Sequence, residues 1–466
     1  SVLGSQGDAG QFRTPRHIID FMVKIVDPKK DERILDPACG TAGFLVSSYK
    51  HIMAANRDEK GNSTLTPDEK AKLARGFTGY DISPDMVRLS LVNMYLHGFV
   101  DPHIYEYDTL TSQERWREDA DVILANPPFM SPKGGIRPHN RFTVQSKRSE
   151  VLFVDYMAVH LSPKGRAAII VPEGIIFQSQ GTYVQLRKML VENYLVAVVS
   201  LPAGVFNPYS GVKTSILILD KELAKRSSTI GFFKVENDGF GLGAQRRAIE
   251  KNDMLEVELG ISEYLRKLKK GDSLDEFKPS YSQIITKGKI AASCDYNLSA
   301  IRYLEDITKS FQFKLGRLDE VFSKICNGVN VCQIDDVGKY RVSRIQTIAD
   351  GSVNLKKIKY TNDEVKPDSF LRSGEILLSH INSIDHLGKS AIFPDGVDDV
   401  IHGINLIRFV PDRSQINPLY AIRIFKTDWF INKIKSFAQK AVNQASVKAS
   451  DLRSIKIPLP SIKVQQ

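Results

Sequence analysis

Cysteine is scarce in this chain, and the residue patterns that build metal centres are missing. Cys39, Cys294, Cys326 and Cys332 are the only cysteines among 466 residues. Their separations fit neither a zinc-ligand pattern nor a disulfide framework. The nine histidines form no H-E-x-x-H or similar cluster, so we expect no metal. We read Cys39 as a small buried residue rather than a nucleophile.

Nucleotide-binding and membrane signals are absent as well. The sequence contains neither G-x-G-x-x-G nor a Walker A pattern, which argues against dinucleotide and nucleoside-triphosphate binding. No apolar stretch reaches transmembrane length and no signal peptide is visible, which predicts a soluble, cytoplasmic protein. A chain of 466 residues is long enough for two or three domains, each with its own core.

Positive charge is present in excess and is unevenly spread. Lys and Arg total 64 against 54 Asp and Glu, a formal net charge of +10. From Phe311 onward the counts are 23 and 16, so most of the excess lies in the last third. A solvated basic face is one explanation, and contact with phosphates is the other.

The tetrapeptide Asn126-Pro127-Pro128-Phe129 follows the apolar run 121–125, which reads as a strand buried on both faces. Open α/β sheets bind ligands at such carboxyl ends. Two prolines fix φ and remove two backbone donors, so we expect a rigid turn whose carbonyls point outward as unpaired acceptors. An amide, a carbonyl and an aromatic face predict a receptor for a planar NH₂ group: adenine, cytosine or a glutamine amide. A Pro-rich turn is the alternative.

A small-residue turn stands about ninety residues upstream. The apolar residues 33–35 run into Asp-Pro-Ala-Cys-Gly-Thr-Ala-Gly-Phe-Leu at 36–45. Gly40 and Gly43 allow the backbone to approach a ligand closely, and Asp36 at the strand end can hold a cationic or hydroxyl-bearing group.

Two more acidic residues end strand-like segments. Asp81 follows 76–80, where it is placed to accept hydrogen bonds from ribose hydroxyls, and Asp108 follows 102–107. Each carboxylate alone is typical of a turn or a helix cap. Four polar strand ends in sequence order instead predict a single ligand site.

Together these segments resemble the adenine-N6 DNA methyltransferases of the gamma class, and most closely the modification subunits of type I restriction-modification systems. Gln-Phe-Arg-Thr-Pro-Arg at 11–16 resembles the first cofactor motif, and Asn126 to Phe129 the catalytic motif. The family more often has glycine where Ala42 stands and an aromatic where Arg13 stands. The resemblance implies an α/β fold with a doubly wound, Rossmann-like sheet that binds S-adenosyl-L-methionine.

The resemblance also implies the roles of individual residues. Catalytic roles fall to Asn126, Pro127, Pro128 and Phe129. Cofactor-binding roles fall to Gln11, Phe12, Thr14, Pro15, Asp36, Ala38, Gly40, Thr41, Ala42, Gly43, Phe44, Asp81, Ile82, Asp108, Thr109, Leu110 and Asn126.

The remaining order of elements fits the same fold. Residues 154–161 read as a helix, 166–171 as a strand, 183–192 as a helix, and 195–201 and 214–219 as strands, an alternation that indicates a mostly parallel sheet. In the family the last two strands form a hairpin, and an aromatic after the first of them stacks on the flipped base. Phe206 fits that position, so Phe129 and Phe206 are expected to sandwich an adenine; a buried loop aromatic is the alternative reading of Phe206.

The last third resembles one target-recognition half of a type I specificity subunit, an α+β domain. The residues that carry this resemblance are the opening at 313–321, the strand-rich 371–379 and the exit at 452–460. Polar segments at 379–386 and 439–448 are candidates to enter a major groove. We therefore divide the chain into a methyltransferase domain at 1–235, a helical, charged spacer completing the catalytic domain at 236–310, and a target-recognition domain at 311–466. Within the spacer we predict a helical stretch at 254–270. We expect the catalytic sheet to end before residue 239.

These features predict a site-specific methyltransferase that acts on N6 of a flipped-out adenine in double-stranded DNA. Expected partners are a second copy of the chain or the specificity and restriction subunits of the same system, because one half-domain reads one half-site. Both ends of the sequence look truncated relative to the family, because the family carries a helical domain before the 11–16 motif and a pairing helix after the exit. The alternatives are a methyltransferase acting on protein glutamine or RNA, and a DNA specificity module without catalysis.

Overall fold

The computed structural model describes residues 13–129, 135–243, 245–277, 279–303, 313–382, 386–441 and 444–465. Backbone contacts divide the chain into two compact units, Ser1–Ala300 and Ile301–Gln466, and each has its own hydrophobic core. The domain limits at 235 and 310 stay predictions. Within the described ranges, no helix combines the length and the apolar character that crossing a membrane requires.

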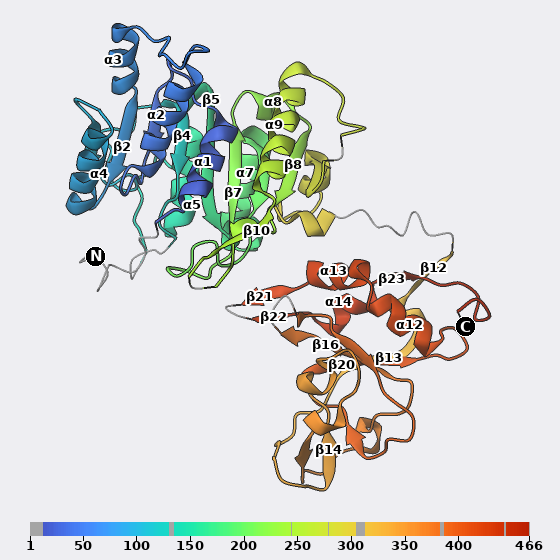
Figure 1. Ribbon diagram of the computed structural model, residues 1–466. Coiled ribbons are helices and arrows are strands. Elements are labelled where there is room, and N and C mark those ends of the chain that lie inside the picture. Colours follow the sequence, from blue (N-terminus) through green and yellow to red (C-terminus); the bar gives the residue numbers. More distant parts are fainter. Residues whose placement is uncertain are drawn as a thin grey trace. The chain divides into compact units, whose positions relative to one another are not determined.

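A nine-stranded sheet organises the first unit (Figure 1), in the order β11-β8-β6-β7-β5-β4-β1-β2-β3. Strands β1 to β5 run parallel, whereas β7 runs antiparallel to both β5 and β6. The mostly parallel sheet and the β6–β7 hairpin are therefore confirmed. The strands are β1 (Ile34–Asp36), β2 (Phe77–Asp81), β3 (His103–Glu106), β4 (Ala120–Ala125), β5 (Leu161–Pro172), β6 (Leu195–Ser200), β7 (Thr214–Asp220), β8 (Thr229–Lys234) and β11 (Ser282–Thr286).

The strand order reverses between β1 and β4, which are neighbours in the sheet. From β1 the chain adds β2 and β3 on one side, and from β4 it adds β5 on the other. Crossover connections on either side of such a point leave a crevice outside the carboxyl ends of the strands. In β4, Val122 to Ala125 have no exposed surface, as expected for a strand covered on both faces.

Helices cover the faces of this sheet (Figure 1). Helix α1 contacts α2 and α9 and packs on β4 and β5, whereas α5 contacts α7. The helices are α1 (Arg16–Val26), α2 (Gly43–Ala55), α3 (Pro67–Arg75), α4 (Pro84–Leu96), α5 (Ser149–Val159), α6 (Glu173–Phe177), α7 (Gly181–Asn193), α8 (Leu223–Arg226), α9 (Met254–Lys270) and α10 (Lys287–Ala291).

Helix α5 begins five residues before the predicted start at residue 154. Its residues from Ser149 to Ala158 are all buried, so the helix has no polar face to mark its period in the sequence. Strand β5 likewise starts at Leu161, within the segment predicted as helix.

The expectation that the sheet ends before residue 239 is wrong. Strand β11 pairs antiparallel with β8 and forms the edge of the same sheet. Helix α9, which matches the predicted helical stretch 254–270, packs on β8 and on α1. The charged composition of this segment hid the edge strand, because an edge strand is only half covered and needs few apolar residues.

The second unit is built from short strands and helices. Its central antiparallel sheet has the order β13-β20-β16-β18, and smaller sheets have the orders β15-β14-β19, β12-β23 and β17-β22-β21. The strands are β12 (Leu315–Arg317), β13 (Phe322–Asn327), β14 (Tyr340–Val342), β15 (Lys359–Thr361), β16 (Ile376–Ser379), β17 (Ile381–Asn382), β18 (Ser390–Ile392), β19 (Val400–Ile401), β20 (Leu406–Pro411), β21 (Gln439–Ala441), β22 (Gln444–Ser446) and β23 (Lys456–Pro458), and the α-helices are α11 (Leu318–Val321), α12 (Pro418–Phe425), α13 (Asp428–Ser436) and α14 (Ala449–Arg453).

The opening and exit segments of the second unit meet. Strand β12 of the opening pairs antiparallel with β23 of the exit, and Gly316 lies opposite Ile457. A Cβ on Gly316 would come within 2.8 Å of the Leu459 side chain, so a larger residue there would require that side chain to move. The two polar segments proposed to enter a groove also share one small sheet, since β17 and β21 both pair with β22. Residues 383–385 and 442–443 of those segments lie outside the described residues.

Candidate active site

Four polar residues converge at the carboxyl edge of strands β1 to β4. Asp36 ends β1, Asp81 ends β2, Asp108 comes shortly after β3, and Asn126 follows β4. Because these strands are parallel neighbours, their carboxyl ends lie at one edge of the sheet. The fold thus brings the four strand-end residues to one edge of the sheet, and their shared ligand stays a prediction.

The turn between β1 and α2 is fixed by hydrogen bonds from outside it. The Gly40 N–H donates to Asp81 Oδ2 at 3.0 Å, and the Ser90 hydroxyl donates to the Gly40 carbonyl at 2.5 Å. The Asn93 amide donates to the Thr41 carbonyl at 2.6 Å. Gly40 has φ +53°, and a Cβ there would meet no atom within 4 Å. The turn is therefore held rigid around open space.

Ser90 and Asn93 are residues that the sequence reading missed. They lie three positions apart on α4, so they occupy one face of that helix and reach the same turn. A polar pair at this spacing, on the helix that follows the second acidic strand end, was the only available signal.

Ala42 stands in the left-handed region, with φ +60°, immediately before α2. This backbone geometry costs an alanine roughly 1 kcal/mol relative to glycine. The Ala42 side chain is fully buried in the core cluster, and the burial of its methyl group offsets a cost of that size. The neighbouring Cys39 is also buried, as expected, and burial raises the pKa of its thiol.

Two carboxyl groups at this edge resist ionisation. Burial raises the pKa of Asp36 well above its usual value, and the nearby Asp81 carboxylate raises it further. Asp36 Oδ1 accepts one hydrogen bond, from the Ala38 N–H at 3.1 Å. Burial also raises the pKa of Asp81, although its oxygens accept from the N–H groups of Gly40 and Ser83. A cationic or hydroxyl-bearing ligand would relieve this desolvation.

The residue after Asp81 presents an apolar surface. Ile82 is 67% exposed, whereas Leu110 of the neighbouring turn is buried. An exposed isoleucine beside a half-buried carboxylate can pack against one face of a flat ring.

The turn after β3 is held by its own hydrogen bonds, and its cofactor-binding role stays a prediction. Asp108 Oδ1 accepts from the Leu110 N–H at 3.0 Å, so the carboxylate caps its own turn, which was the simpler reading. The buried Thr109 hydroxyl donates to the Pro37 carbonyl at 2.7 Å. The two turns are thereby tied together, and the segment acts on the site through the position of residues 36–38.

The Asn126 amide joins the first motif to the fourth strand end. Asn126 Nδ2 donates to Thr14 Oγ1 at 3.0 Å, across 112 positions of sequence. This orientation turns Asn126 Oδ1 away from Thr14, and within the described ranges Oδ1 accepts no hydrogen bond. Gln11 and Phe12 of the first motif lie outside the described residues.

The expectation of unpaired proline carbonyls needs a correction. The Pro128 carbonyl accepts from the Ser149 hydroxyl at 3.2 Å, because α5 begins directly beside the tetrapeptide. Pro127 is buried and Phe129 is half-buried against the core cluster, which leaves part of the Phe129 ring exposed.

Phe206 does not offer a free aromatic face in this structure. It is 3% exposed and belongs to the core cluster, so the buried alternative holds for this residue. Tyr209 lies in the same loop, is 56% exposed, and donates its N–H to the Phe206 carbonyl at 2.9 Å. Sequence reading missed Tyr209, although an aromatic after Asn-Pro in the same loop was a usable signal.

The predicted spacer also reaches the first motif. His17 Nε2 and Asp238 Oδ2 lie 2.9 Å apart, and Asp238 pairs with Arg246 as well. Asp238 opens a hairpin of β9 (Asp238–Phe240) and β10 (Ala248–Asn252), and the Asn207 amide donates to the Leu242 carbonyl of that hairpin at 2.7 Å. The hairpin therefore fastens both α1 and the loop that carries Tyr209.

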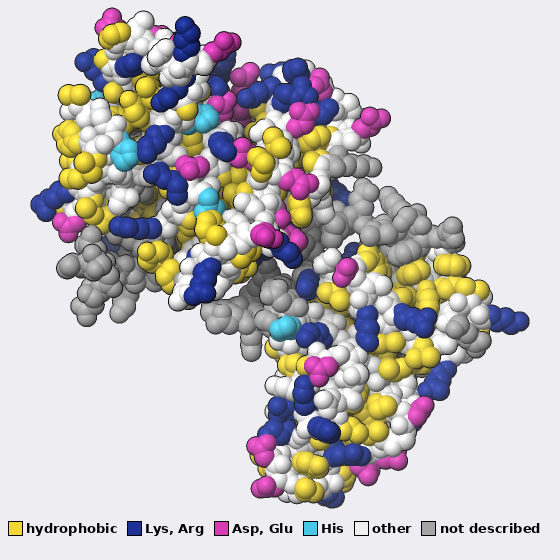
Figure 2. Space-filling model, viewed as in Figure 1, with side chains coloured by type: hydrophobic (Ala, Val, Ile, Leu, Met, Phe, Trp, Pro, Cys, Tyr) yellow, Lys and Arg dark blue, Asp and Glu magenta, His cyan; other side chains and the backbone are white. Residues whose placement is uncertain are grey.

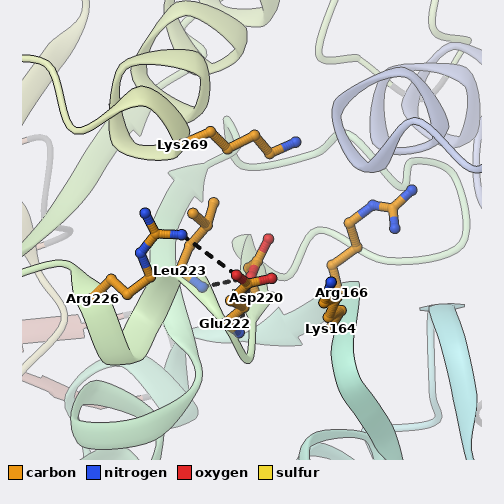
Figure 3. A pocket seen from close by; sticks show the side chains of 7 residues that line it. All are labelled: Lys164, Arg166, Asp220, Glu222, Leu223, Arg226 and Lys269. Carbon is orange, nitrogen blue, oxygen red and sulfur yellow. Dashed lines mark hydrogen bonds and ion pairs between the residues drawn. The ribbon is translucent and has the colours of Figure 1, made fainter.

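A cavity of about 210 Å³ lies elsewhere, lined by seven residues (Figure 3). Arg166 pairs in register with Val122, near the beginning of β4, and with Asp220 at the end of the antiparallel β7. The cavity therefore marks the amino edge of the parallel strands, opposite to Asn126. Arg166 already binds Glu32, and Arg226 binds Glu222, so the lining charges are partly neutralised. The lining residues are Lys164, Arg166, Asp220, Glu222, Leu223, Arg226 and Lys269.

Comparison with known families and proteins gives matches for both units. The profile of the N-6 DNA methylase family matches residues 4–311, and that of the type I restriction modification DNA specificity domain matches residues 312–466. The chain is 37% identical over 223 residues to the type I restriction enzyme EcoEI methylase subunit of Escherichia coli, covering 47% of this chain and 44% of that protein. It is 36% identical over 160 residues to a putative type I restriction enzyme MjaX specificity subunit of Methanocaldococcus jannaschii, covering 33% of this chain and 37% of that protein.

Solved structures agree on the fold. A chain from a structure of a type I R-M system superposes with a TM-score of 0.52 at 29% identity, covering 62% of this chain and 58% of that one. The type IIG restriction endonuclease BpuSI superposes with a TM-score of 0.53 at 12% identity, covering 97% of this chain and 59% of that one, which shows a shared fold alone. The chain spans about half or less of the length of the methylase subunits that it matches. On the evidence of the profile that covers residues 4–311, the chain belongs to the N-6 DNA methylase family.

Proposed function

We propose that this chain is a site-specific DNA methyltransferase that transfers a methyl group from S-adenosyl-L-methionine to N6 of an adenine. The observation that carries the proposal is the Asn126 amide. It stands at the end of β4, next to β1 and its turn, and Thr14 orients it so that its oxygen is free to accept. Family membership and the methylase and specificity relatives support the same activity.

The residues at the strand ends fit S-adenosyl-L-methionine. Asp36 and Asp81 are carboxyl groups whose pKa values are raised by burial, and the amino and ribose groups of the cofactor are the kinds of partner that would relieve that burial. The open space at Gly40 admits a ligand against the backbone. The exposed Ile82 gives an apolar contact for an adenine ring. When bound, the cofactor supplies a methyl group on a positively charged sulfur.

The tetrapeptide supplies the receptor for the target base. An adenine within a duplex is out of reach, so it is extruded at a cost of a few kcal/mol, which aromatic stacking offsets by about 1 to 3 kcal/mol per base. Phe129 forms one wall. Because Phe206 is buried, we propose the exposed Tyr209 as the second wall in its place.

Asn126 Oδ1 and the Pro127 carbonyl act as acceptors for the N6 amino group. Two acceptors on the same nitrogen draw its lone pair out of conjugation with the ring and hold it toward the donor side of the site. This is catalysis by positioning and electrostatic stabilisation, without a covalent intermediate. The proton leaves after transfer, so we assign no dedicated base.

The choice of DNA rests on the second unit. Its match to a type I specificity domain and its excess of Lys and Arg support recognition of double-stranded DNA. One such domain reads one half-site, so we propose that two copies, or one copy with a specificity or restriction subunit, engage a bipartite site. Light scattering after size-exclusion on duplex DNA measures the stoichiometry. A 1:1 complex that is fully active on a single half-site would overturn this part.

The activity is tested with labelled S-adenosyl-L-methionine and unmethylated genomic DNA, followed by identification of the modified base. N6-methyladenine formation by the wild type, its loss in Asn126→Ala, and retained cofactor binding in that variant are the expected results. Transfer to RNA or to protein glutamine instead of DNA would contradict the proposal. Wild-type chain that binds cofactor and DNA but transfers nothing would identify a specificity module without catalysis.

A further inference from the structure

The loop between the catalytic tetrapeptide and α5 carries an unusual set of charges. Its described part, residues 135–148, contains Arg137, Arg141, Lys147 and Arg148 and no Asp or Glu. On the face shown in Figure 2, by contrast, Lys and Arg side chains are interspersed with Asp and Glu. Within the described part of the chain, none of these four cations forms an ion pair. Within the described residues, these four cations therefore contribute no ion pair to the fold.

The loop is folded onto the protein in a defined way. From residue 141 to residue 147, exposed and buried side chains alternate, with Phe142, Val144 and Ser146 inward. The Val144 N–H donates to the buried Asp155 carboxylate at 2.7 Å. The Phe142 ring lies against the Trp116 ring, with centroids 5.0 Å apart.

The exposed face of the same stretch is basic and polar. Arg141, Thr143, Gln145 and Lys147 are exposed in alternation with the buried residues, and Arg148 follows them. Because the inward residues fix the backbone, the cations of this stretch are held on its exposed side. Binding would therefore order only the side chains of these cations and not the backbone, which limits the entropic cost of binding.

The base of the loop rests on the catalytic tetrapeptide. The Ile136 N–H donates to the Lys147 carbonyl at 3.1 Å, so the two ends of the loop close on each other. Ser149, next to Arg148, donates its hydroxyl to the Pro128 carbonyl at 3.2 Å. The cations are thus tied to the position of Asn126 by a short, rigid path.

We infer that the loop 135–148 is a phosphate clamp: its exposed cations bind the DNA backbone beside the extruded adenine. The inference rests on the proposed function, because it takes the polyanion to be the DNA that delivers the base. Backbone phosphates are the groups that planar Arg and flexible Lys side chains recognise without reading sequence. Contacts of this kind hold the duplex in register while the second unit selects the site.

The test compares two variants of the full chain with equal changes of charge. The first, Arg141→Gln/Lys147→Gln/Arg148→Gln, removes three of the four cations of the clamp. The matched control, Lys164→Gln/Arg226→Gln/Lys269→Gln, neutralises the cavity rim at the opposite edge of the sheet (Figure 3). Fluorescence anisotropy with a labelled duplex gives the dissociation constant at a series of KCl concentrations.

We expect the clamp variant to bind roughly 10- to 100-fold more weakly at low salt and to lose about 0.9 from the salt-dependence slope for each phosphate contact removed. The control should keep the slope of the wild type. Equal slopes for the clamp variant and the wild type would overturn the inference, and so would equal losses in the clamp variant and the control.

A second variant with one added negative charge keeps the inference testable if the triple variant does not fold. Asn140→Asp places a carboxylate on the exposed part of the loop without removing a cation. It should raise the dissociation constant at low salt while cofactor binding and thermal stability stay at wild-type values; an unchanged dissociation constant would contradict the clamp. If the wild type binds duplex but transfers no methyl group, the proposed function fails, and the slopes still decide the clamp independently.

Discussion

The hydrogen bond between Thr14 and Asn126 offers a direct test of how the amide is positioned. Thr14→Val keeps the shape of the side chain but removes the acceptor that receives Asn126 Nδ2 at 3.0 Å. The amide then loses the contact that distinguishes its two ends, so its oxygen is no longer held as the free acceptor. Thr14→Ser is the matched control, because it retains the hydroxyl.

The expected size follows from the value of one hydrogen bond. A single bond contributes about 1 kcal/mol net, and about 1.4 kcal/mol corresponds to a tenfold change in rate. We therefore expect Thr14→Val to lower kcat about fivefold at least, and further if the amide rotates, since misplaced groups cost up to about a hundredfold. KM for the cofactor and for DNA should change little, because the contact serves the reacting amino group.

The assay is steady-state methyl transfer at varied DNA and cofactor concentrations, which gives kcat and KM, together with thermal unfolding of each variant. Thr14→Ser should remain within about twofold of the wild type in kcat. Two results would refute the reasoning: a Thr14→Val variant with wild-type kcat, or a Thr14→Ser variant that falls as far as Thr14→Val. A fall in kcat that tracks a fall in unfolding temperature would assign the bond a structural role instead.

Three further predictions follow from burial and charge. Tyr209→Ala should lose about 1 to 3 kcal/mol of base stacking, which raises KM for DNA and reduces the fluorescence change of a 2-aminopurine at the target position. Phe206→Ala should instead lower the free energy of unfolding by about 3 to 5 kcal/mol, because Phe206 is buried in the core. The reverse pattern would restore Phe206 as the second wall. Burial raises the pKa of Asp155 to about 6, so the folded chain keeps a proton that the unfolded chain releases near pH 4. This group alone should lower the free energy of unfolding by about 3 kcal/mol between pH 4 and 7, so in urea titrations the difference between the wild type and Asp155→Asn should shift by that amount over this range, and a constant difference would refute it. Glu375→Ala should destabilise the second unit by about 3 to 5 kcal/mol in urea, because it leaves the buried Arg408 without its charge partner, while a loss below about 1 kcal/mol would show that water reaches the pair.

Local sequence determined the parts of the first unit that depend on short-range rules. The apolar run before Asn126 predicted β4, and the helix at 254–270 was predicted at its observed limits. In both cases the whole sequence pattern lies within a single element. The acidic strand ends could be placed at one edge for the same reason, since parallel neighbours share a carboxyl edge.

The same short-range rules failed for a helix that is buried on all sides and for a strand at the edge of the sheet. Helix α5 has no polar face, so its start at Ser149 left no periodic mark. Strand β11 lies at a sheet edge, and the charged residues around it resembled a spacer. Both elements depend on contacts with segments distant in the sequence: α5 packs against α7, and β11 pairs with β8. No local pattern encodes such contacts.

Sequence alone therefore determined most of the candidate site residues, because residue type and motif order are local properties. Only the tertiary structure decided which of them are available. It buried Phe206 and exposed Tyr209 within one loop, paired the Pro128 carbonyl with Ser149, and joined Thr14 to Asn126. Exposure and hydrogen bonding across long separations depend on how whole elements pack, so they are settled when the sheet and its covering helices assemble.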